Sequence, residues 1–578
     1  MTKLKISKFF LVILLLASFL CFYKLAKVPV SLFGDEWDVG YHAYSILKTG
    51  RDYSGNFMPL HFESLAEWRT PLYLYSAVPT VALFGISPWG VRSPAAIFGI
   101  LGIWGIYLLA NQIFKGEKLK FSKFEVGVGE IAALVLAINP WHIQYSRAGF
   151  EVSQLLAFLI FGLYFFFKSL KNPKFLWLSV TLLCFTPWIY STAKLFTPFL
   201  LLFMFIVWRK EILRMPKKEL VKTVVAGLVI GLPIALSTIF GGGSQRFGYV
   251  SVFTDPTTIP EVGSARQIDA LVRGETGTGL TPTLYDRVIH NKYTFWGKRI
   301  VDNYFKAFST EFLFNKGDLN LRHSIEGIGL FYKVEVVMLL AGFVFFVFSK
   351  VNRKKKALVF FWTLFGVVPA AITRDGGNHA TRLILILPPL VFLISFGLIS
   401  VYKRLKGIPR LLLAASYLLL LAIGFINYQH QFWVHNPWYS ERWWHYGWKE
   451  AINLVRQNES GFDKVVISMS GEPAWIFFAG AYEYPPGEWQ KNFPVGNDVE
   501  LEGFGKVSHI DKYYFSSPPG TLYDWGKVLD KNTLYLANAN EVKVDLIREP
   551  ERTPSDLNLL GSVAFPSGEP AFFLFSGK

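Results

Sequence analysis

The sequence predicts a polytopic α-helical membrane protein of about eleven transmembrane helices, followed by a small extracytoplasmic α/β domain. Of its 578 residues, 52% are hydrophobic and 17% are aromatic, which is more than one soluble core needs. The apolar residues form runs that cross, or nearly cross, a hydrocarbon layer about 30 Å thick. These runs begin near Phe9, Ser93, Ile131, Val152, Phe175, Leu195, Val221, Phe331, Ala357, Leu383 and Leu411.

Basic residues predict the orientation in the membrane. The net charge of +17 comes mainly from short loops between the apolar runs and not from one basic domain, which disfavours a nucleic-acid-binding function. Under the positive-inside rule we expect these loops and the basic N-terminus on the cytoplasmic side of the cell's inner membrane. The loops are residues 115–123, 168–174, 209–222, 350–356 and 403–410.

Two segments near the N-terminus decide this topology. The run from Phe9 to Tyr23 follows three lysines, as in a secretory signal, but no small-x-small cleavage site comes after it. We therefore expect a retained first span. A crossing by the segment from Pro71 to Phe84 would move every later basic loop outside, so we expect a pair of juxtamembrane helices at the interface there.

The two cysteines, Cys21 and Cys184, lie in apolar runs, which excludes a disulfide framework.

This topology divides the chain into two parts. Residues 1–427 are expected to form the transmembrane domain, with outer loops 29–92 and 241–330, and residues 428–578 the extracytoplasmic domain. In the second part, Ser440 is expected to cap a helix from Glu441 to Gln457. The runs KVVISM at 464–469 and AFFLFS near the C-terminus have the composition of buried strands.

Carboxylates gather directly after the first span, in the motif FGDEWD. Asp35, Glu36 and Asp38 lie at a membrane boundary, where charged groups are costly unless paired or used. One of them could accept the proton of an attacking hydroxyl as a general base. The alternative is a structural acidic flank or helix cap. A divalent metal bound by all three is a third, weaker interpretation, and we expect no metal or other cofactor.

Cations follow on the same predicted face. A leaving phosphate needs cations, because charge accumulates on its oxygens as the bond to the sugar breaks. Each cation alone is more typical of an interfacial anchor, but five together indicate a shared anionic ligand. They are Arg69, Arg92, Arg147, Lys194 and Arg382.

Polar loops add further candidates for binding. The long outer loop contains GDLNLRHS, with Asp318, Arg322 and His323, and a later turn contains TRDGGNHATR, with His379. Such polar density beside lipid suits a headgroup or sugar site, although a hydrogen-bonded rim of the bundle is the alternative. His142, His323 and His379 are far apart in sequence and lack the close spacing typical of a zinc site.

These motifs together resemble the GT-C superfamily of membrane glycosyltransferases. The likeness is to bacterial relatives of protein O-mannosyltransferases and lipid A aminoarabinose transferases. It covers residues 8–428 and rests on the DE pair at 35–36, WRTPLY at 68–73, NPWHIQYSR at 139–147 and HATRLILILP at 379–388. The family often has a basic residue or histidine directly before the proline, where this chain has Thr70.

The resemblance implies an inverting transfer of a hexose or pentose from a polyprenyl-phosphate carrier to an acceptor hydroxyl of a protein or glycan on the outer face. It implies Asp35 as the catalytic base, with Glu36 in support. We expect Arg69, Arg147, Lys194 and Arg382 to bind the donor phosphate. The residues expected to contact the sugar or acceptor are Trp37, Tyr41, His142, Arg322, His323 and His379.

Three other functions remain open from the sequence. A lipid or sugar transporter, or flippase, would carry charges near the membrane midplane and broken helices in matching halves, and we see no such internal symmetry. A non-catalytic assembly subunit would use the DE pair structurally. An oligosaccharide ligase would take a diphosphate-linked donor instead.

Overall fold

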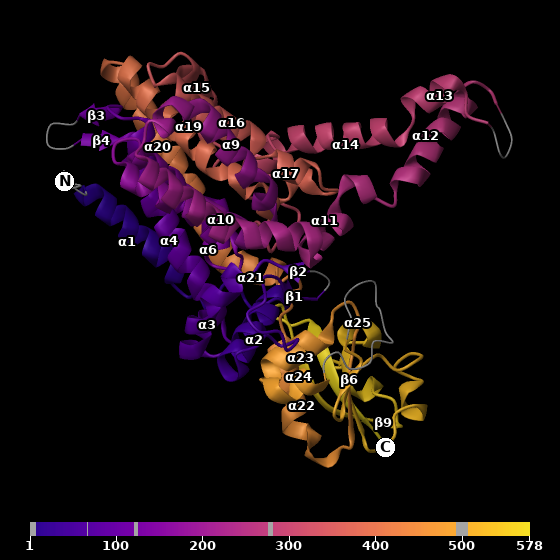
Figure 1. Cartoon of the computed structure of the whole chain (residues 1–578). Helices are drawn as coiled ribbons and strands as arrows, with labels where there is room; N and C mark the ends of the chain where they lie inside the picture. The colour runs from indigo at the N-terminus through magenta and orange to yellow at the C-terminus, as the bar shows by residue number, and fades with distance from the viewer. Residues whose placement is uncertain (1–6, 66–67, 121–124, 276–280, 493–506) are drawn as a thin grey trace.

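The computed structural model describes residues 7–65, 68–120, 125–275, 281–492 and 507–578. Lys123, in the first predicted basic loop, lies outside these ranges. Long helices packed side by side form a bundle, and a smaller domain containing a β-sheet is attached at one end (Figure 1). The chain is therefore a polytopic helical protein with a C-terminal sheet domain, as the sequence predicts.

Each of the eleven predicted apolar runs forms a helix. Six stretches among the described residues are long and apolar enough to cross a membrane: 88–113, 152–169, 191–213, 217–240, 380–404 and 407–439. The eleven helices are α1 (Lys8–Phe22), α4 (Pro88–Ile113), α5 (Val128–Ile138), α7 (Val152–Ser169), α8 (Leu176–Phe185), α9 (Ser191–Leu213), α10 (Lys217–Phe240), α15 (Glu335–Val347), α16 (Arg353–Phe365), α19 (Leu387–Arg404) and α20 (Gly407–His430).

Two glycines let α15 and α19 approach at backbone distance. A Cβ at Gly342 would lie 1.9 Å from the carbonyl oxygen of Leu393, and a Cβ at Gly397 would lie 2.2 Å from that of Met338. Small residues at such crossings are typical of membrane helices, where close van der Waals packing replaces the hydrophobic driving force.

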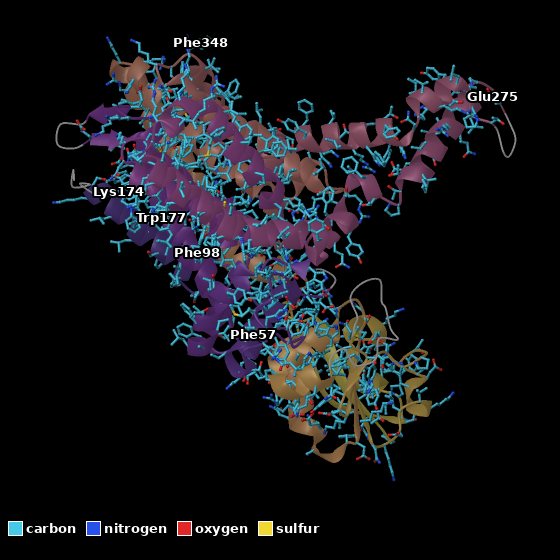
Figure 2. All side chains as sticks on the ribbon, viewed as in Figure 1. Phe57, Phe98, Lys174, Trp177, Glu275 and Phe348 are labelled. Atoms are coloured by element: carbon cyan, nitrogen blue, oxygen red, sulfur yellow. The ribbon has the colours of Figure 1, made fainter. Side chains whose placement is uncertain are left out.

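The predicted basic loops meet at one end of the bundle. Lys403 pairs with Glu117, and Lys354 pairs with Glu211. The ammonium group of Lys355 lies over the ring of Phe167, close to the 168–174 loop. Figure 2 shows Lys174 and Phe348 toward this end, whereas Phe57 lies at the other, beside the C-terminal domain. A short hairpin, β3 (Lys118–Lys120) with β4 (Glu125–Gly127), also belongs here (Figure 1).

The opposite end, called the loop face below, carries α2 (Gly34–Thr49), the short pair β1 (Phe62–Glu63) and β2 (Trp68–Arg69), and α3 (Leu72–Phe84). The segment 71–84 was expected to be a pair of helices but forms one, because Pro79 is accommodated inside α3. The 13 residues of α3 rise about 20 Å, less than the roughly 30 Å of a hydrocarbon layer.

Part of the second predicted loop, 241–330, folds into an arm that projects sideways from the bundle (Figure 1). It contains α11 (Gln245–Val250), α12 (Thr258–Val272), α13 (Leu284–Ile289) and α14 (Lys292–Lys306). Glu275 lies near the tip (Figure 2). Large apolar side chains of the arm are exposed, among them Ile259 at 83% and Val272 at 82%. The chain then returns to the bundle before α15.

Short helices complete the loop face: α6 (Pro140–Ser146), α17 (Val368–Ala371), α18 (Ala380–Leu383) and α21 (Asn436–Tyr439). Between α10 and α11, Gly241 ends the long helix and residues 242–244 form one 3-10 turn. The glycines at this point therefore form an exit from the bundle.

The C-terminal domain is built on a six-stranded sheet in the order β6-β7-β5-β8-β10-β9. β5 runs parallel to β7 and β8, and the other pairs are antiparallel. The strands are β5 (Lys464–Ile467), β6 (His509–Ile510), β7 (Tyr513–Phe515), β8 (Thr533–Asn538), β9 (Leu557–Ala564) and β10 (Pro570–Gly577), and the helices are α22 (Trp448–Asn458), α23 (Ala474–Tyr482), α24 (Pro486–Asn492) and α25 (Ala539–Val542).

Both predicted strands are present, as β5 and β10. The predicted helix at 441–457 begins only at Trp448, because Gly447 has a φ of +98° that interrupts any earlier helix. The Ser440 hydroxyl donates to the Asn436 carbonyl and does not act as the predicted cap.

The C-terminal domain shares a hydrophobic core with α2. Helices α23 and α24 lie between α2 and the sheet (Figure 1). Trp37 packs so tightly on α23 that a Cβ at Gly480 would lie 2.6 Å from its ring. The Tyr41 hydroxyl donates to the carbonyl of Tyr484 at 3.0 Å. Helix α2 and the C-terminal domain are therefore packed as one unit on the loop face.

Candidate active site

The site is built around the start of α2. Asp35 is half-buried in its first turn, where a carboxylate is favoured by the helix dipole. The amide of Gly34, the preceding residue, donates to Nδ1 of His445, whose Nε2 lies 3.0 Å from Glu472. A side chain close to the C-terminal domain therefore fixes the turn that carries Asp35. Nothing in the local sequence around His445 indicates this contact.

Glu36, expected to support the base, is fully engaged in holding the fold together. Its carboxylate accepts from Nε and Nη2 of Arg92 at 2.7 and 2.8 Å and from the amide of Gly149 at 2.7 Å. Glu36 and Arg92 are both fully buried. The pair ties α2 to α4 and to the turn after α6, so we leave Glu36 out of the catalytic site.

Arg69 lies beside Asp35 and also faces other carboxylates. Its Nη1 donates to the Asp35 carbonyl at 3.1 Å and to Oδ2 of Asp38 at 3.2 Å, and its Nη2 lies 3.7 Å from Glu151. Tyr53 and Ser64 also donate to Asp38. Arg69, expected to bind phosphate, therefore also braces the Asp35 turn. The partners Tyr53, Ser64 and Glu151 were missed by sequence analysis, because they come from separate loops.

Arg147, also expected to bind the phosphate, is buried against the end of α1. Its Nη1 donates to the carbonyls of Leu20 and Cys21, and its Nη2 to those of Tyr23 and Val28. Its guanidinium lies 4.6 Å from the ring centre of Trp433. A helix C-terminus leaves carbonyls without intrahelical partners, and this arginine satisfies them. We therefore assign it no ligand.

Lys194 and Arg382, the two remaining predicted phosphate residues, line one pocket of about 290 Å³. The pocket lies where α9, α10, α11, α17 and α18 meet, and Leu195, Phe247 and Ile372 form part of its apolar wall. The Lys194 ammonium donates to the Gly243 carbonyl at 2.8 Å, and Arg382 donates to the Thr373 hydroxyl at 2.9 Å. Two cations thus share an otherwise largely apolar pocket.

His61 is a neighbour of this pocket that sequence analysis did not single out. Its Nε2 lies 3.1 Å from the ammonium of Lys194, and its Nδ1 lies 2.8 Å from the Ser237 hydroxyl. Burial, with the charge of Lys194, lowers the pKa of His61 to about 4. The neutral ring therefore accepts a hydrogen bond from Lys194 and holds its ammonium at the pocket.

Asp318, His323 and His379 come together beside α18. The carboxylate of Asp318 accepts from the Ala380 amide at 2.8 Å and lies 3.9 Å from Nδ1 of His379. The His323 and His379 ring centres are 5.0 Å apart. Burial lowers the pKa of His323 to about 3, to which Arg322 and Arg382 contribute, whereas Asp35 acts in the opposite direction. The His323 ring therefore lies within electrostatic range of both Asp35 and Arg382.

The other expected sugar-binding residues are placed differently. Trp37 and Tyr41 are 2% and 0% exposed and are packed on the C-terminal domain, so a sugar cannot stack on either ring without displacing that domain. His142 is 3% exposed and packs on Gly99. Arg322 is half-buried, with its guanidinium 5.1 Å from the ring centre of Phe33. Of these four residues, only Arg322 stays in the candidate site.

Two solved structures show the same overall arrangement. One is ArnT from Cupriavidus metallidurans bound to undecaprenyl phosphate, with a TM-score of 0.50, 12% identity, and coverage of 98% of this chain and 97% of that one. The other is an Archaeoglobus fulgidus oligosaccharyltransferase in complex with Zn and sulfate, with a TM-score of 0.53, 13% identity and coverage of 98% and 72%. The chain has the GT-C fold. The resemblance in fold is thus confirmed.

Two sequence comparisons give further matches. A family model described as dolichyl-phosphate-mannose-protein mannosyltransferase matches residues 69–236. YycA of Bacillus subtilis (strain 168), named as a candidate mannosyltransferase, is 27% identical over 110 residues. That match spans 19% of this chain and 15% of the relative's length.

Proposed function

We propose that the protein is an inverting glycosyltransferase, which moves a sugar from a polyprenyl-phosphate carrier to an acceptor hydroxyl on the extracytoplasmic face of the inner membrane. The observation that carries this proposal is the pocket containing Lys194 and Arg382. Its two cations suit a phosphate and its apolar wall suits an isoprenoid chain, so one pocket matches both halves of such a donor. The ArnT structure of similar fold contains undecaprenyl phosphate.

The chemistry needs a base and an electrostatic acceptor for the leaving group. The acceptor oxygen attacks the anomeric carbon while its proton passes to the Asp35 carboxylate. The bond from the anomeric carbon to the phosphate oxygen breaks, and its electron pair stays on the polyprenyl phosphate. Lys194 and Arg382 stabilise the resulting charge. Attack opposite the leaving group inverts the anomeric configuration. Arg322 is proposed to contact the sugar or acceptor, and His323 and His379 to line the site beside it.

The proposed orientation follows from charge. The basic loops meet at the end opposite the loop face, as shown by the Lys403–Glu117 and Lys354–Glu211 pairs. The positive-inside rule puts that end in the cytoplasm, and therefore puts the loop face and the C-terminal domain outside.

Donor binding tests this function directly. Purified protein in nanodiscs is titrated with undecaprenyl phosphate, and with a prenyl alcohol of the same length that lacks the phosphate. We expect Lys194→Ala and Arg382→Ala each to weaken phosphate-dependent binding at least tenfold while thermal stability is kept. Lys292→Ala, in the arm, is the matched control. Equal binding by both pocket variants and the control would refute the donor site.

The alternatives give different results in the same preparation. A flippase would move labelled lipid between leaflets without forming a glycosylated product, and a ligase would require a diphosphate-linked donor. Sugar transfer from a monophosphate-linked donor to a hydroxyl acceptor would support the proposal over both.

A further inference from the structure

We propose that Asp318, His323 and His379 form a binding site for one transition-metal ion of the zinc class. One ligand atom from each of the three lies within 4.8 Å of the others. Asp318 and His323 come from the loop after the arm, and His379 comes from the turn before α18. These side chains are distinct from the carboxylates of the FGDEWD motif.

The donor set selects the metal. Two imidazoles and one carboxylate are typical of zinc sites that keep a fourth position open, whereas magnesium and calcium prefer oxygen ligands alone. Bonds of about 2.1 Å in a tetrahedron require ligand atoms about 3.4 Å apart. The three side chains must therefore close inward by less than about 1.5 Å. The side chain of His379, which is 23% exposed, can make most of this movement.

Hydrogen bonds outside the cluster already orient two of the ligands. The Asp318 carboxylate accepts from the amides of Asn320 and Ala380. Nδ1 of His323 lies 3.1 Å from the Thr381 hydroxyl, so a proton on Nδ1 leaves the Nε2 lone pair for the ion. Partners of this kind fix ring orientation and tautomer in metal sites.

The surrounding charges indicate what occupies the open position. Arg322 directly precedes His323, and Arg382 lies three residues after His379, so a divalent cation here would add to existing positive charge. A phosphate oxygen would balance it, and Arg382 also lines the proposed donor pocket. This second step rests on the proposed function, whereas metal binding itself does not.

Sequence analysis expected no metal because the histidines lack close spacing along the chain. Separation in sequence does not measure separation in the fold, because α18 brings His379 back to the 318–323 loop. The Ala380–Asp318 and Thr381–His323 contacts are the two links that do this.

Metal content tests the proposal without any assay of transfer. Full-length protein in nanodiscs, without donor, is stripped with chelator, dialysed against Zn²⁺ and measured by mass spectrometry of the metal. We expect one ion per chain in the wild type and a loss of at least tenfold in affinity for His379→Gln and Asp318→Asn. Co²⁺ in place of Zn²⁺ should give the absorption of a tetrahedral site.

The matched control is His290→Gln, since His290 also contacts an aspartate, Asp269, at 2.8 Å, but in the arm. Loss of metal in this control as well, or a wild type that retains none, would overturn the proposal. His379 is only partly buried, so its variant should fold; a thermal transition equal to that of the wild type verifies this.

Undecaprenyl phosphate binding then tests the phosphate step. With the metal present, affinity should rise at least tenfold in the wild type and not in His379→Gln. Stoichiometric metal with unchanged lipid affinity would overturn the phosphate step alone. No lipid binding under any condition would refute the proposed function while leaving the metal site standing.

Discussion

Arg92 donates hydrogen bonds to both carboxylate oxygens of Glu36, from Nε at 2.7 Å and from Nη2 at 2.8 Å, and both side chains are fully buried. Removing one partner leaves the other as an uncompensated buried charge. We expect Glu36→Ala to lower stability by about 3–5 kcal/mol. Thermal unfolding in detergent measures this. Glu311→Ala, which breaks an exposed pair with Lys316, should leave the unfolding temperature almost unchanged, because solvent screens such a pair.

If Glu36→Ala is as stable as the wild type but has lost turnover, Glu36 instead has the catalytic role that the sequence suggested.

Arg147 should behave as a structural residue. Arg147→Ala leaves four carbonyls around α1 without their donor, so we expect a clear drop in the thermal transition. The protein that remains folded should bind undecaprenyl phosphate within about twofold of the wild type, because no phosphate contact is lost. Lys194→Ala should show the reverse pattern. Selective loss of lipid affinity in Arg147→Ala would reinstate it as a donor ligand.

Asp35→Asn tests the base. The amide keeps the size of the side chain but cannot take up the acceptor's proton. General base catalysis is worth roughly 10²- to 10⁴-fold, so turnover should fall by that factor while lipid affinity and unfolding temperature stay unchanged. Sugar transfer from a polyprenyl-phosphate donor is the assay. A well-folded variant with normal turnover would remove Asp35 from the mechanism.

His61 should give stability a pH dependence. The pKa is about 4 in the folded protein, against an ordinary value near 6.5, so the unfolded chain binds more protons between these values. Stability contributed by the neutral ring is therefore present in full above about pH 6.5 and is lost as pH falls toward 4.

His61→Gln should flatten the slope of unfolding temperature against pH in this window. The comparison is made as a difference from the wild type, since the buried His142 contributes with the same sign. An unchanged slope would show that folding does not lower the pKa of His61.

Gly480 tests the contact between α2 and the C-terminal domain. A methyl group there would lie 2.6 Å from the flat, buried ring of Trp37, which cannot yield as a flexible chain end would. We expect Gly480→Ala to cost about 1–3 kcal/mol and to expose the domain junction to limited proteolysis. Gly487→Ala, where a methyl group meets nothing within 4 Å, is the matched control and should be neutral. Equal protease resistance in both variants would contradict the tight junction.

The sequence predicted the helical bundle well because lipid imposes a simple pattern: long apolar runs bounded by basic loops. All eleven runs are helices, and the loops meet at one end, as the Lys403–Glu117 pair shows. It predicted single contacts poorly. Glu36 and Arg92 are 56 positions apart, and charge alone cannot distinguish a catalytic carboxylate from one that is buried and paired.

The predicted phosphate-binding residues have different surroundings in the fold. Lys194 and Arg382 were chosen by the same reasoning as Arg147, yet two line a pocket and one closes a helix end. Trp37 and Tyr41 looked like sugar platforms because aromatic residues near a boundary are typical of binding sites. Their partners lie more than 400 positions later, beyond the range of any local pattern.

The shared core of α2 and the C-terminal domain also has a consequence for biosynthesis. Trp37 emerges from the ribosome early, and its partner Gly480 emerges only after most of the bundle has been inserted. Throughout that interval the apolar face of α2 lacks its final cover. At a synthesis rate of 5–20 residues per second, the interval lasts on the order of 20 to 90 seconds. The turn that carries Asp35 therefore cannot acquire its contact with His445 until the last quarter of the chain is being synthesised.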